Sequence, residues 1–198
     1  LDVIETGRRP KGGVSKYTSG IPSIGAESIY GVGVFNFSKV KYVPEDFYAK
    51  MKSGKIHHKD VLLYKDGGKP GEFKPRLGMY GFDFPFDEMG INEHVFRLRS
   101  SLLGQDYLYY ATGDYRVLSD LAVRGGKAAI PGINQKDVKT EDILKPTPQV
   151  LSAFNQIVSR MTDSMLSNAK QSRTLASIRD TLLPKLLSGE LRVSEAEK

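Results

Sequence analysis

Cysteine and tryptophan are both absent from this chain of 198 residues. The lack of cysteine excludes disulfide bridges, cysteine nucleophiles and thiolate zinc sites together, and it fits a reducing compartment. No apolar run approaches the ~18–20 residues that a membrane span needs. Leu1–Glu5 lack the basic start and apolar stretch of a signal peptide. The sequence thus predicts no membrane span and no secretion signal, and because no Met stands first we expect Leu1 to be a cut or trimmed end.

Glycine and tyrosine are almost absent from the last part of the chain. All ten tyrosines and all but one of the 20 glycines lie within residues 1–146, and Phe154 is the only aromatic residue after Pro146. Glycine suits turns and tyrosine suits half-buried strands, so this part predicts an α+β domain of strands, loops and short helices. We expect a long helix over residues 147–193 and a flexible tail over residues 194–198.

Short elements are indicated within the first part. Apolar runs predict strands at Ile29–Phe35, Val61–Tyr64 and Val95–Leu98. Helical spacing predicts short helices at Pro44–Lys52 and Asp114–Val123.

The long helix has a clear start and an apolar seam. Thr147 is a suitable N-cap, and Pro148 fits the first helical position, where its missing N–H costs nothing. Apolar residues then recur in steps of three and four, as in a coiled coil. They are Leu151, Phe154, Val158, Met161, Met165, Leu175, Ile178, Leu182 and Leu186. From Pro148 to about Leu183 such a helix would be ~55 Å long at about 1.5 Å per residue, so we favour one that protrudes and pairs with a second helix. The alternative is a helix that lies on its own domain.

The seam has two polar positions and a marked end. Asn168 and Ser172 interrupt the apolar series, and such positions can fix the register of paired helices. Pro184 is expected to kink or end the helix, with Gly189 at the cap.

Positive charge is concentrated near the N-terminus. The chain holds 29 basic and 23 acidic residues, and residues 1–80 hold 14 of the basic and 8 of the acidic ones. The segment Arg8–Tyr17 combines four cations, flexible glycines and an aromatic ring. This composition is typical of a surface that contacts a polyanion, although a solvated basic loop would look the same.

Enzymatic motifs are weak or missing. The sequence has no GxGxxG motif, no Walker A loop and no HExxH helix, so we expect no cofactor and no metal. For His94 we expect a structural role. One alternative is left open: Asp66, Glu72 and Lys74 echo the acidic-acidic-lysine layout of metal-dependent nucleases.

Four segments together resemble the specificity (S) subunits of type I restriction–modification systems. The run Ser177–Val193 (SIRDTLLPKLLSGELRV) is similar to their closing segment. Ile4–Pro10, followed by Gly20–Gly25, resembles the opening of a target recognition domain. Gly90–Arg99 resembles the central strand of that domain, and Pro131–Asp137 resembles the motif before the conserved helix.

The resemblance implies a non-catalytic subunit that reads double-stranded DNA in a prokaryotic cytoplasm. An S subunit has two target recognition domains, each with a twisted sheet and a following long helix, and its two helices pack antiparallel. Methyltransferase (M) subunits dock on this frame, and restriction (R) subunits join through them. This chain departs from the pattern because it holds one such domain (1–146) and one helix (147–193). We therefore expect either a C-terminal piece or a half-size subunit that pairs with a second copy to read a symmetric, bipartite site.

The residues expected to contact DNA were chosen by their chemistry. Arginine, asparagine and glutamine can pair with base edges, and lysine binds phosphate. The candidates are Arg8, Arg9, Lys11, Lys16, Tyr17, Lys69, Lys74, Arg76, Arg97, Arg99, Arg124, Lys127, Asn134, Gln135 and Lys136. A coiled-coil adaptor with no DNA role is the other class of protein that stays open.

Overall fold

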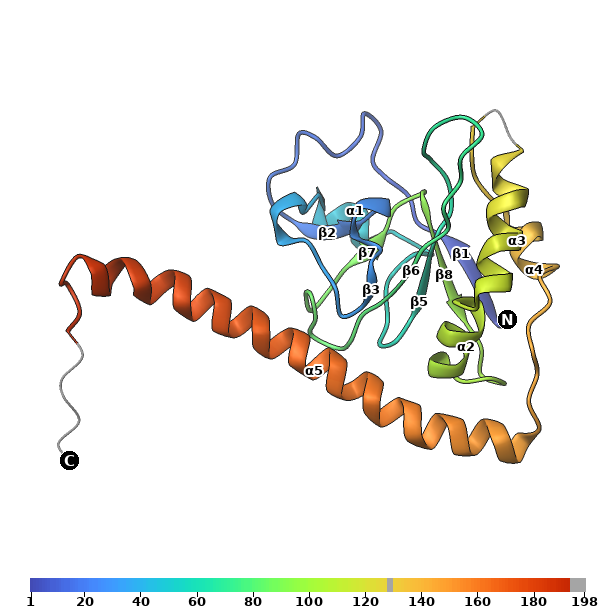
Figure 1. Ribbon diagram of the computed structural model, residues 1–198. Coiled ribbons are helices and arrows are strands. Elements are labelled where there is room, and N and C mark those ends of the chain that lie inside the picture. The colour runs from blue at the N-terminus through green and yellow to red at the C-terminus, as the bar shows by residue number, and fades with distance from the viewer. Residues whose placement is uncertain (128–129, 193–198) are drawn as a thin grey trace.

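A computed structural model describes residues 1–127 and 130–192, which form an α+β domain and a long helix that extends beyond it (Figure 1). The strands are β1 (Val3–Thr6), β2 (Ile21–Ile24), β3 (Gly31–Val32), β4 (Tyr42–Val43), β5 (Val61–Tyr64), β6 (Leu77–Met79), β7 (Gly90–Ile91) and β8 (Val95–Arg99). The α-helices are α1 (Glu45–Ala49), α2 (Gln105–Thr112), α3 (Tyr115–Gly126), α4 (Gln135–Lys139) and α5 (Pro148–Leu187), with 3-10 turns η1 (Ala26–Ser28) and η2 (Phe37–Lys39). The α+β class and the long C-terminal helix predicted from the sequence are confirmed.

A five-stranded mixed sheet forms the centre of the domain. Its strand order is β1-β8-β5-β6-β3, with antiparallel pairs throughout except between β6 and β3. In the central pair, Val61 lies opposite Leu98 and Leu63 lies opposite Phe96. All four of these side chains belong to one hydrophobic cluster, whereas the intervening Leu62 belongs to another. Both faces of β5 are thus buried, which explains its unbroken apolar sequence.

The two faces of this sheet are covered by different layers. Helices α2 and α3 contribute Leu108 and Leu121 to the cluster on one face. On the other face, Ile24 and Ile91 come from the small sheet β4-β2-β7 and join Leu62. The domain therefore has three layers, with the central sheet between the helices and the small sheet (Figure 1).

Helix α5 has the start and the final glycine that the sequence predicts. The Thr147 hydroxyl accepts a hydrogen bond from the Val150 N–H at 3.4 Å, and Pro148 is the first helical residue. The helix has 40 residues, or roughly 60 Å at about 1.5 Å per residue. It continues through Pro184 and ends at Leu187. Gly189, with a φ of 75°, follows the end of the helix and donates to the Leu186 carbonyl, so it closes the last turn as expected.

The first part of α5 lies across the domain. Thr162 and Leu166 are its buried residues, and Leu166 joins the cluster on the helical side of the sheet. The approach is close at Gly33, where an added Cβ would stand 2.9 Å from the Ala169 methyl group. Gly33 also has a φ of 67°, so glycine is favoured there by both space and backbone conformation.

The rest of α5 extends away from the domain (Figure 1). Met161 and Met165 are 60% and 45% exposed, although Leu166 beside them is buried. At about 100° per residue, they lie on a different face of the helix from Leu166. We call the following residues of α5 the exposed stripe, because they are apolar and at least 40% exposed: Val150, Ile157, Met161, Met165, Leu175, Ile178, Leu182, Leu183, Leu186 and Leu187.

The residues of the predicted seam therefore fall into two groups, one that packs on the domain and one that is exposed. Leu151 and Phe154 pack against the domain's own hydrophobic cluster, and Val158 is half-buried. The remaining seam residues are exposed. The expectation of a helix that only protrudes was thus incomplete, because residues 151–173 also contact the domain.

Several predicted elements differ in extent. Ile29–Phe35 contains only the two-residue strand β3, since Gly33, with a φ of 67°, directly follows Val32 and ends the extended run. Helix α1 is shorter than Pro44–Lys52. The strands predicted at Val61–Tyr64 and Val95–Leu98 correspond to β5 and β8, and α3 begins after its cap Asp114. Val193 and the predicted tail 194–198 lie outside the described residues.

None of the helices in the described ranges is both long enough and apolar enough to cross a membrane.

Candidate nucleic-acid interface

Three loops gather at the end of the domain opposite α5 (Figure 1). They are residues 7–20 between β1 and β2, residues 65–76 between β5 and β6, and residues 130–134 before α4. The second and third loops are joined by backbone hydrogen bonds, from Gly67 N–H to the Pro131 carbonyl at 2.9 Å and from Ile133 N–H to the Lys65 carbonyl at 2.8 Å. We call this end the loop face.

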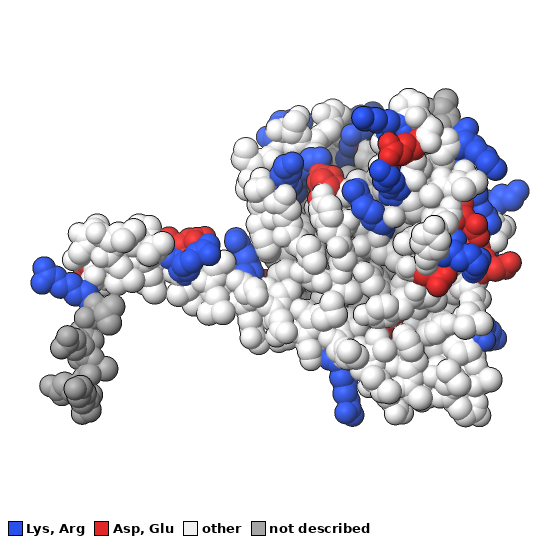
Figure 2. All heavy atoms as spheres, viewed as in Figure 1, with Lys and Arg blue, Asp and Glu red and all other residues white. Residues whose placement is uncertain are grey.

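The loop face carries exposed cations. Figure 2 shows Lys and Arg side chains gathered over this end. The visible side of the protruding arm, which is the part of α5 that extends beyond the domain, is mostly uncharged. Arg8, Lys11 and Lys16 are exposed on the first loop, Lys69 on the second and Lys127 at the end of α3. None of these five forms an ion pair within residues 1–127 and 130–192. Their charges therefore remain available to an anionic partner.

Acidic side chains at this end are already paired. Glu93 contacts Arg9, with 2.7 Å between its Oε1 and the arginine Nε. Glu72 pairs with Lys74, and Glu27 pairs with Lys41 at 2.5 Å. These contacts reduce the repulsion that the carboxylates would exert on a polyanion. They also occupy Arg9 and Lys74, two of the predicted DNA contacts.

His94 connects two of the loops through charged neighbours. Its Nδ1 contacts the Asp66 carboxylate, and its Nε2 lies 3.4 Å from Glu93 Oε1. Asp66 also accepts a hydrogen bond from Lys65 Nζ at 2.6 Å. Burial would raise the pKa of Asp66, but the hydrogen bonds from Lys65 and His94 outweigh it and hold this pKa below its usual value. Sequence spacing gave no sign of this cluster, because Asp66 and His94 are 28 residues apart.

Two further candidates for DNA contact on these loops, Arg76 and Tyr17, already have contacts within the domain. Arg76 donates a hydrogen bond to the Ala26 carbonyl at 3.0 Å, and its guanidinium lies 4.8 Å from the centre of the Tyr64 ring. Tyr17 is half-buried, with Lys16 Nζ 5.1 Å from its ring centre. Arg76 thus bonds to other parts of the domain, whereas Lys16 places its cation over the ring of Tyr17.

The five candidates from Arg124 to Lys136 form a patch, and three of them are held by contacts within the domain. Arg124 binds the Asp137 carbonyl at 3.1 Å and the Glu141 carboxylate at 3.0 Å. The Asn134 amide oxygen caps α4, and the Gln135 amide donates to the Ile4 carbonyl at 3.2 Å. Only Lys127 and Lys136 of this patch present exposed charges without such partners in the described ranges.

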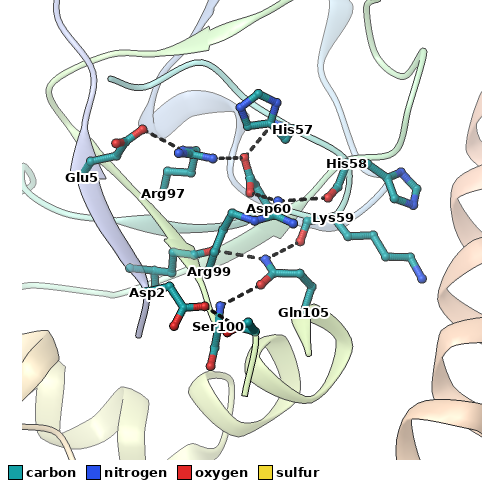
Figure 3. Close-up of polar contacts among 12 residues, drawn as sticks. Asp2, Glu5, His57, His58, Lys59, Asp60, Arg97, Arg99, Ser100 and Gln105 are labelled. Atoms are coloured by element: carbon teal, nitrogen blue, oxygen red, sulfur yellow. Dashed lines mark hydrogen bonds and ion pairs between the residues drawn. The ribbon is translucent and has the colours of Figure 1, made fainter. Parts of the chain in front are cut away.

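Arg97 and Arg99, two of the predicted DNA contacts, both bind the buried Asp60 carboxylate. Arg97 is 7% exposed, and it binds Glu5 at 2.8 Å and Asp60 at 2.9 Å (Figure 3). Arg99 also contacts Asp60, which is fully buried. Burial alone would lower the pKa of Arg97, but the Asp60 and Glu5 carboxylates outweigh it and raise this pKa above its ordinary value. Arg97 is thus used inside the fold, whereas the Arg99 side chain is 33% exposed and is held by its contact with Asp60.

The nuclease layout is not assembled either. Asp66 pairs with Lys65 and His94, while Glu72 pairs with Lys74. In the ranges that the structure describes, no group of three or more His, Asp or Glu side chains is placed to hold a metal ion.

The fold and the loop face together define a basic α+β domain carried on a long helical arm. No protein-family model matches the chain. Its curated relatives include the type I restriction enzyme MjaIX specificity subunit of Methanocaldococcus jannaschii, which is 27% identical over 139 residues, or 70% of this chain and 31% of that protein. The type I restriction enzyme HindI specificity subunit of Haemophilus influenzae is 34% identical over 76 residues, or 38% of this chain and 16% of that protein.

The chain is therefore a homologue of type I restriction enzyme specificity subunits, as its sequence motifs predict. Its matches span less than a third of the length of these curated relatives. A chain in a solved structure of the type I R-M system is 15% identical with a TM-score of 0.42, and the match covers 92% of this chain and 42% of that chain.

Proposed function

We propose that the chain recognises double-stranded DNA as a specificity subunit, or as part of one, in a type I restriction–modification enzyme. The observation that carries this proposal is the loop face, where three loops present exposed cations and the neighbouring acids are already paired. The homology to specificity subunits supports it. In this proposal the chain performs no chemistry, and its loops read one half of a bipartite site.

The loops offer two kinds of DNA contact. The exposed Lys11, Lys16 and Lys69 can neutralise phosphates, which gives affinity that falls as salt rises. Arg8 is exposed and free of ion pairs within the described residues, so its guanidinium can pair with O6 and N7 of a guanine. Arg8 is therefore our first candidate for a base-reading contact.

The proposed partners follow from the arm and the homology. The exposed stripe would pack antiparallel against the same stripe of a second copy, or against the second helix of a longer S subunit. Methyltransferase subunits would dock on this frame, and restriction subunits would join through them. In this division, residues 1–146 form the target recognition domain and residues 147–193 form the spacer.

The test compares two double variants in the assembly with the cognate M subunit. Arg8→Ala with Lys11→Ala removes two free cations of the loop face. Lys139→Ala with Lys145→Ala removes two exposed cations near the start of α5 and serves as the matched control. Each specific contact is worth ~1–3 kcal/mol, so we expect the first variant to bind a cognate duplex at least about tenfold more weakly in fluorescence anisotropy.

Three outcomes would count against the proposal. Unchanged affinity of the Arg8/Lys11 variant would contradict a role of the loop face in DNA contact. A complete lack of DNA binding by the parent assembly would favour the adaptor class. Magnesium-dependent cleavage by the purified chain, lost in Glu72→Ala, would favour the nuclease.

A further inference from the structure

Lys59 is a buried lysine at the junction between the domain and α5. It is 6% exposed and lies in the turn that enters β5. Its φ of 58° is uncommon for a residue with a side chain. Such a conformation persists only where the surroundings over-determine it.

The backbone of this turn is anchored in the domain. The Lys59 N–H donates to the Tyr80 carbonyl at 2.9 Å, and the Lys59 carbonyl accepts from the Gln105 amide at 2.9 Å. The next residue, Asp60, is fully buried and binds Arg97 of β8. The lysine backbone is therefore fixed to the central sheet and to α2.

The side chain points the other way, toward α5. Figure 3 shows it leaving the Asp60 cluster and extending to the α5 ribbon. Its Nζ lies 2.8 Å from Asp163 Oδ1 and 2.9 Å from Ser159 Oγ, both on α5. It also lies 3.2 Å from Asp106 Oδ2 on α2. One ammonium group thus bonds α2 of the domain and α5 together.

The Asp106 and Asp163 carboxylates differ in burial, and therefore in how strongly they depend on the charge of Lys59. The Asp106 side chain is 10% exposed, so the loss of Lys59 would leave its charge buried without compensation. The Asp163 side chain is 56% exposed, so water can solvate it when the contact is broken. The domain therefore requires the lysine, and the arm contact can be removed without leaving a buried charge alone.

The other contacts of α5 with the domain lie on either side of the Lys59 contact. Leu166 and Gly33 bring the helix close to the domain, but hydrophobic contact is non-directional. The Asn155 amide donates to the Leu103 carbonyl at 2.9 Å, and Lys170 pairs with Asp83 at 3.4 Å between side chains that are 54% and 36% exposed. Hydrogen bonds from the ammonium group to Ser159 and Asp163 restrict both the rotation and the sliding of the helix.

We propose that Lys59 is a positioning residue that fixes the angle between α5 and the domain. The loop face belongs to the domain and the exposed stripe belongs to α5, and the Lys59 contact joins the domain to α5. The contact therefore sets the position of one surface relative to the other. If two such chains pair through their arms, which rests on the proposed function, Lys59 also contributes to the distance between their two loop faces.

The test measures the position of α5 relative to the domain. The chain has no cysteine, so Tyr115→Cys on α3 and Lys185→Cys near the end of α5 give two unique positions for spin labels. Double electron–electron resonance on labelled chain diluted with excess unlabelled chain reports the distance within one molecule. We expect a single narrow distance distribution for the parent.

The deciding variant is Ser159→Ala with Asp163→Ala, which removes both side-chain acceptors of α5, leaves only the Ser159 backbone carbonyl at 3.4 Å, and keeps the Lys59–Asp106 pair. Its matched control is Ser167→Ala with Asp180→Ala, the same two substitutions at exposed positions of α5. We expect the narrow peak to be lost in the deciding variant and kept in the control, with the same circular dichroism for both. A parent-like distribution in the deciding variant, or a broad one in the parent itself, would overturn the proposal. Neither measurement involves DNA or an M subunit, so the outcome is independent of the proposed function.

Discussion

At the scale of single residues, the same residue type serves opposite purposes in this protein. Arg97 is buried between Glu5 and Asp60, and its removal would leave the fully buried Asp60 with less compensation. Arg8 is exposed on the loop face. Arginine suits both places because it keeps its charge and offers several donors in a planar fork.

Asp66 provides a prediction for acid stability. Its pKa is lowered from 3.8 in the folded protein, so the folded state favours its ionised form. The resulting stabilisation is present above the unfolded pKa of 3.8 and is lost as pH falls through the lower folded value. We expect Asp66→Asn to reduce the free energy of unfolding at neutral pH, and the difference from the parent to shrink below about pH 4.

Urea unfolding of both proteins at a series of pH values measures this difference. Asp87→Asn, at an exposed acidic position, controls for the loss of one charge. A difference that stays constant down to the acid limit of the folded protein would show that the Lys65 and His94 contacts do not stabilise the Asp66 carboxylate.

At the scale of elements, α5 combines two functions on different faces. The face that includes Thr162 and Leu166 packs on the domain, and these residues are 1% and 5% exposed. The face that includes Met161 and Ile178 is exposed along its length, at 60% and 48% for these two. Because neighbouring residues differ by about 100° around a helix, one sequence can serve both faces.

Leu166 and Met161 test this division. Truncation of a buried leucine typically costs about 2–5 kcal/mol, because it loses apolar burial and leaves a cavity. An exposed residue away from such features changes stability by about 0.5 kcal/mol or less. We expect Leu166→Ala to destabilise the chain by about 2–5 kcal/mol and Met161→Ala to have little effect, in denaturant unfolding at submicromolar concentration. Equal losses from the two variants would contradict the assignment of faces.

At the scale of the whole molecule, the loop face and the arm lie at opposite ends of the domain (Figure 1). The exposed stripe runs along both the docked and the protruding parts of α5. An apolar stripe of this length is typical of an interaction surface, because soluble proteins rarely leave large apolar patches in water.

We predict that the chain self-associates through this stripe. Sedimentation at micromolar concentration should show a species of twice the 22.0 kDa chain mass. Met161→Glu with Ile178→Glu should shift it to the single chain, because charges in an apolar interface lose hydration without a partner. Ser152→Glu with Ser177→Glu, at exposed positions on the other side of α5, is the matched control. A parent that sediments only as a 22.0 kDa species would refute the pairing.

The parts of the fold that the sequence predicts are those with local signals. The apolar run Val61–Tyr64 is the buried strand β5, and Thr147 with Pro148 marks the start of α5. Caps and apolar runs depend on residues that are close along the chain, so they can be recognised without knowing the fold. Ile29–Phe35 was predicted less well, because the backbone conformations of its glycines depend on their surroundings.

The sequence alone determined the α+β class, the long helix, the positive charge of the N-terminal part and the resemblance to specificity subunits. Only the tertiary structure decided which cations are exposed and which face of α5 meets the domain. The reason is the separation of the contacts involved: Glu5 and Arg97 are 92 residues apart, and Lys59 and Ser159 are 100 apart. Burial of a charge depends on such distant partners, and no local pattern records them.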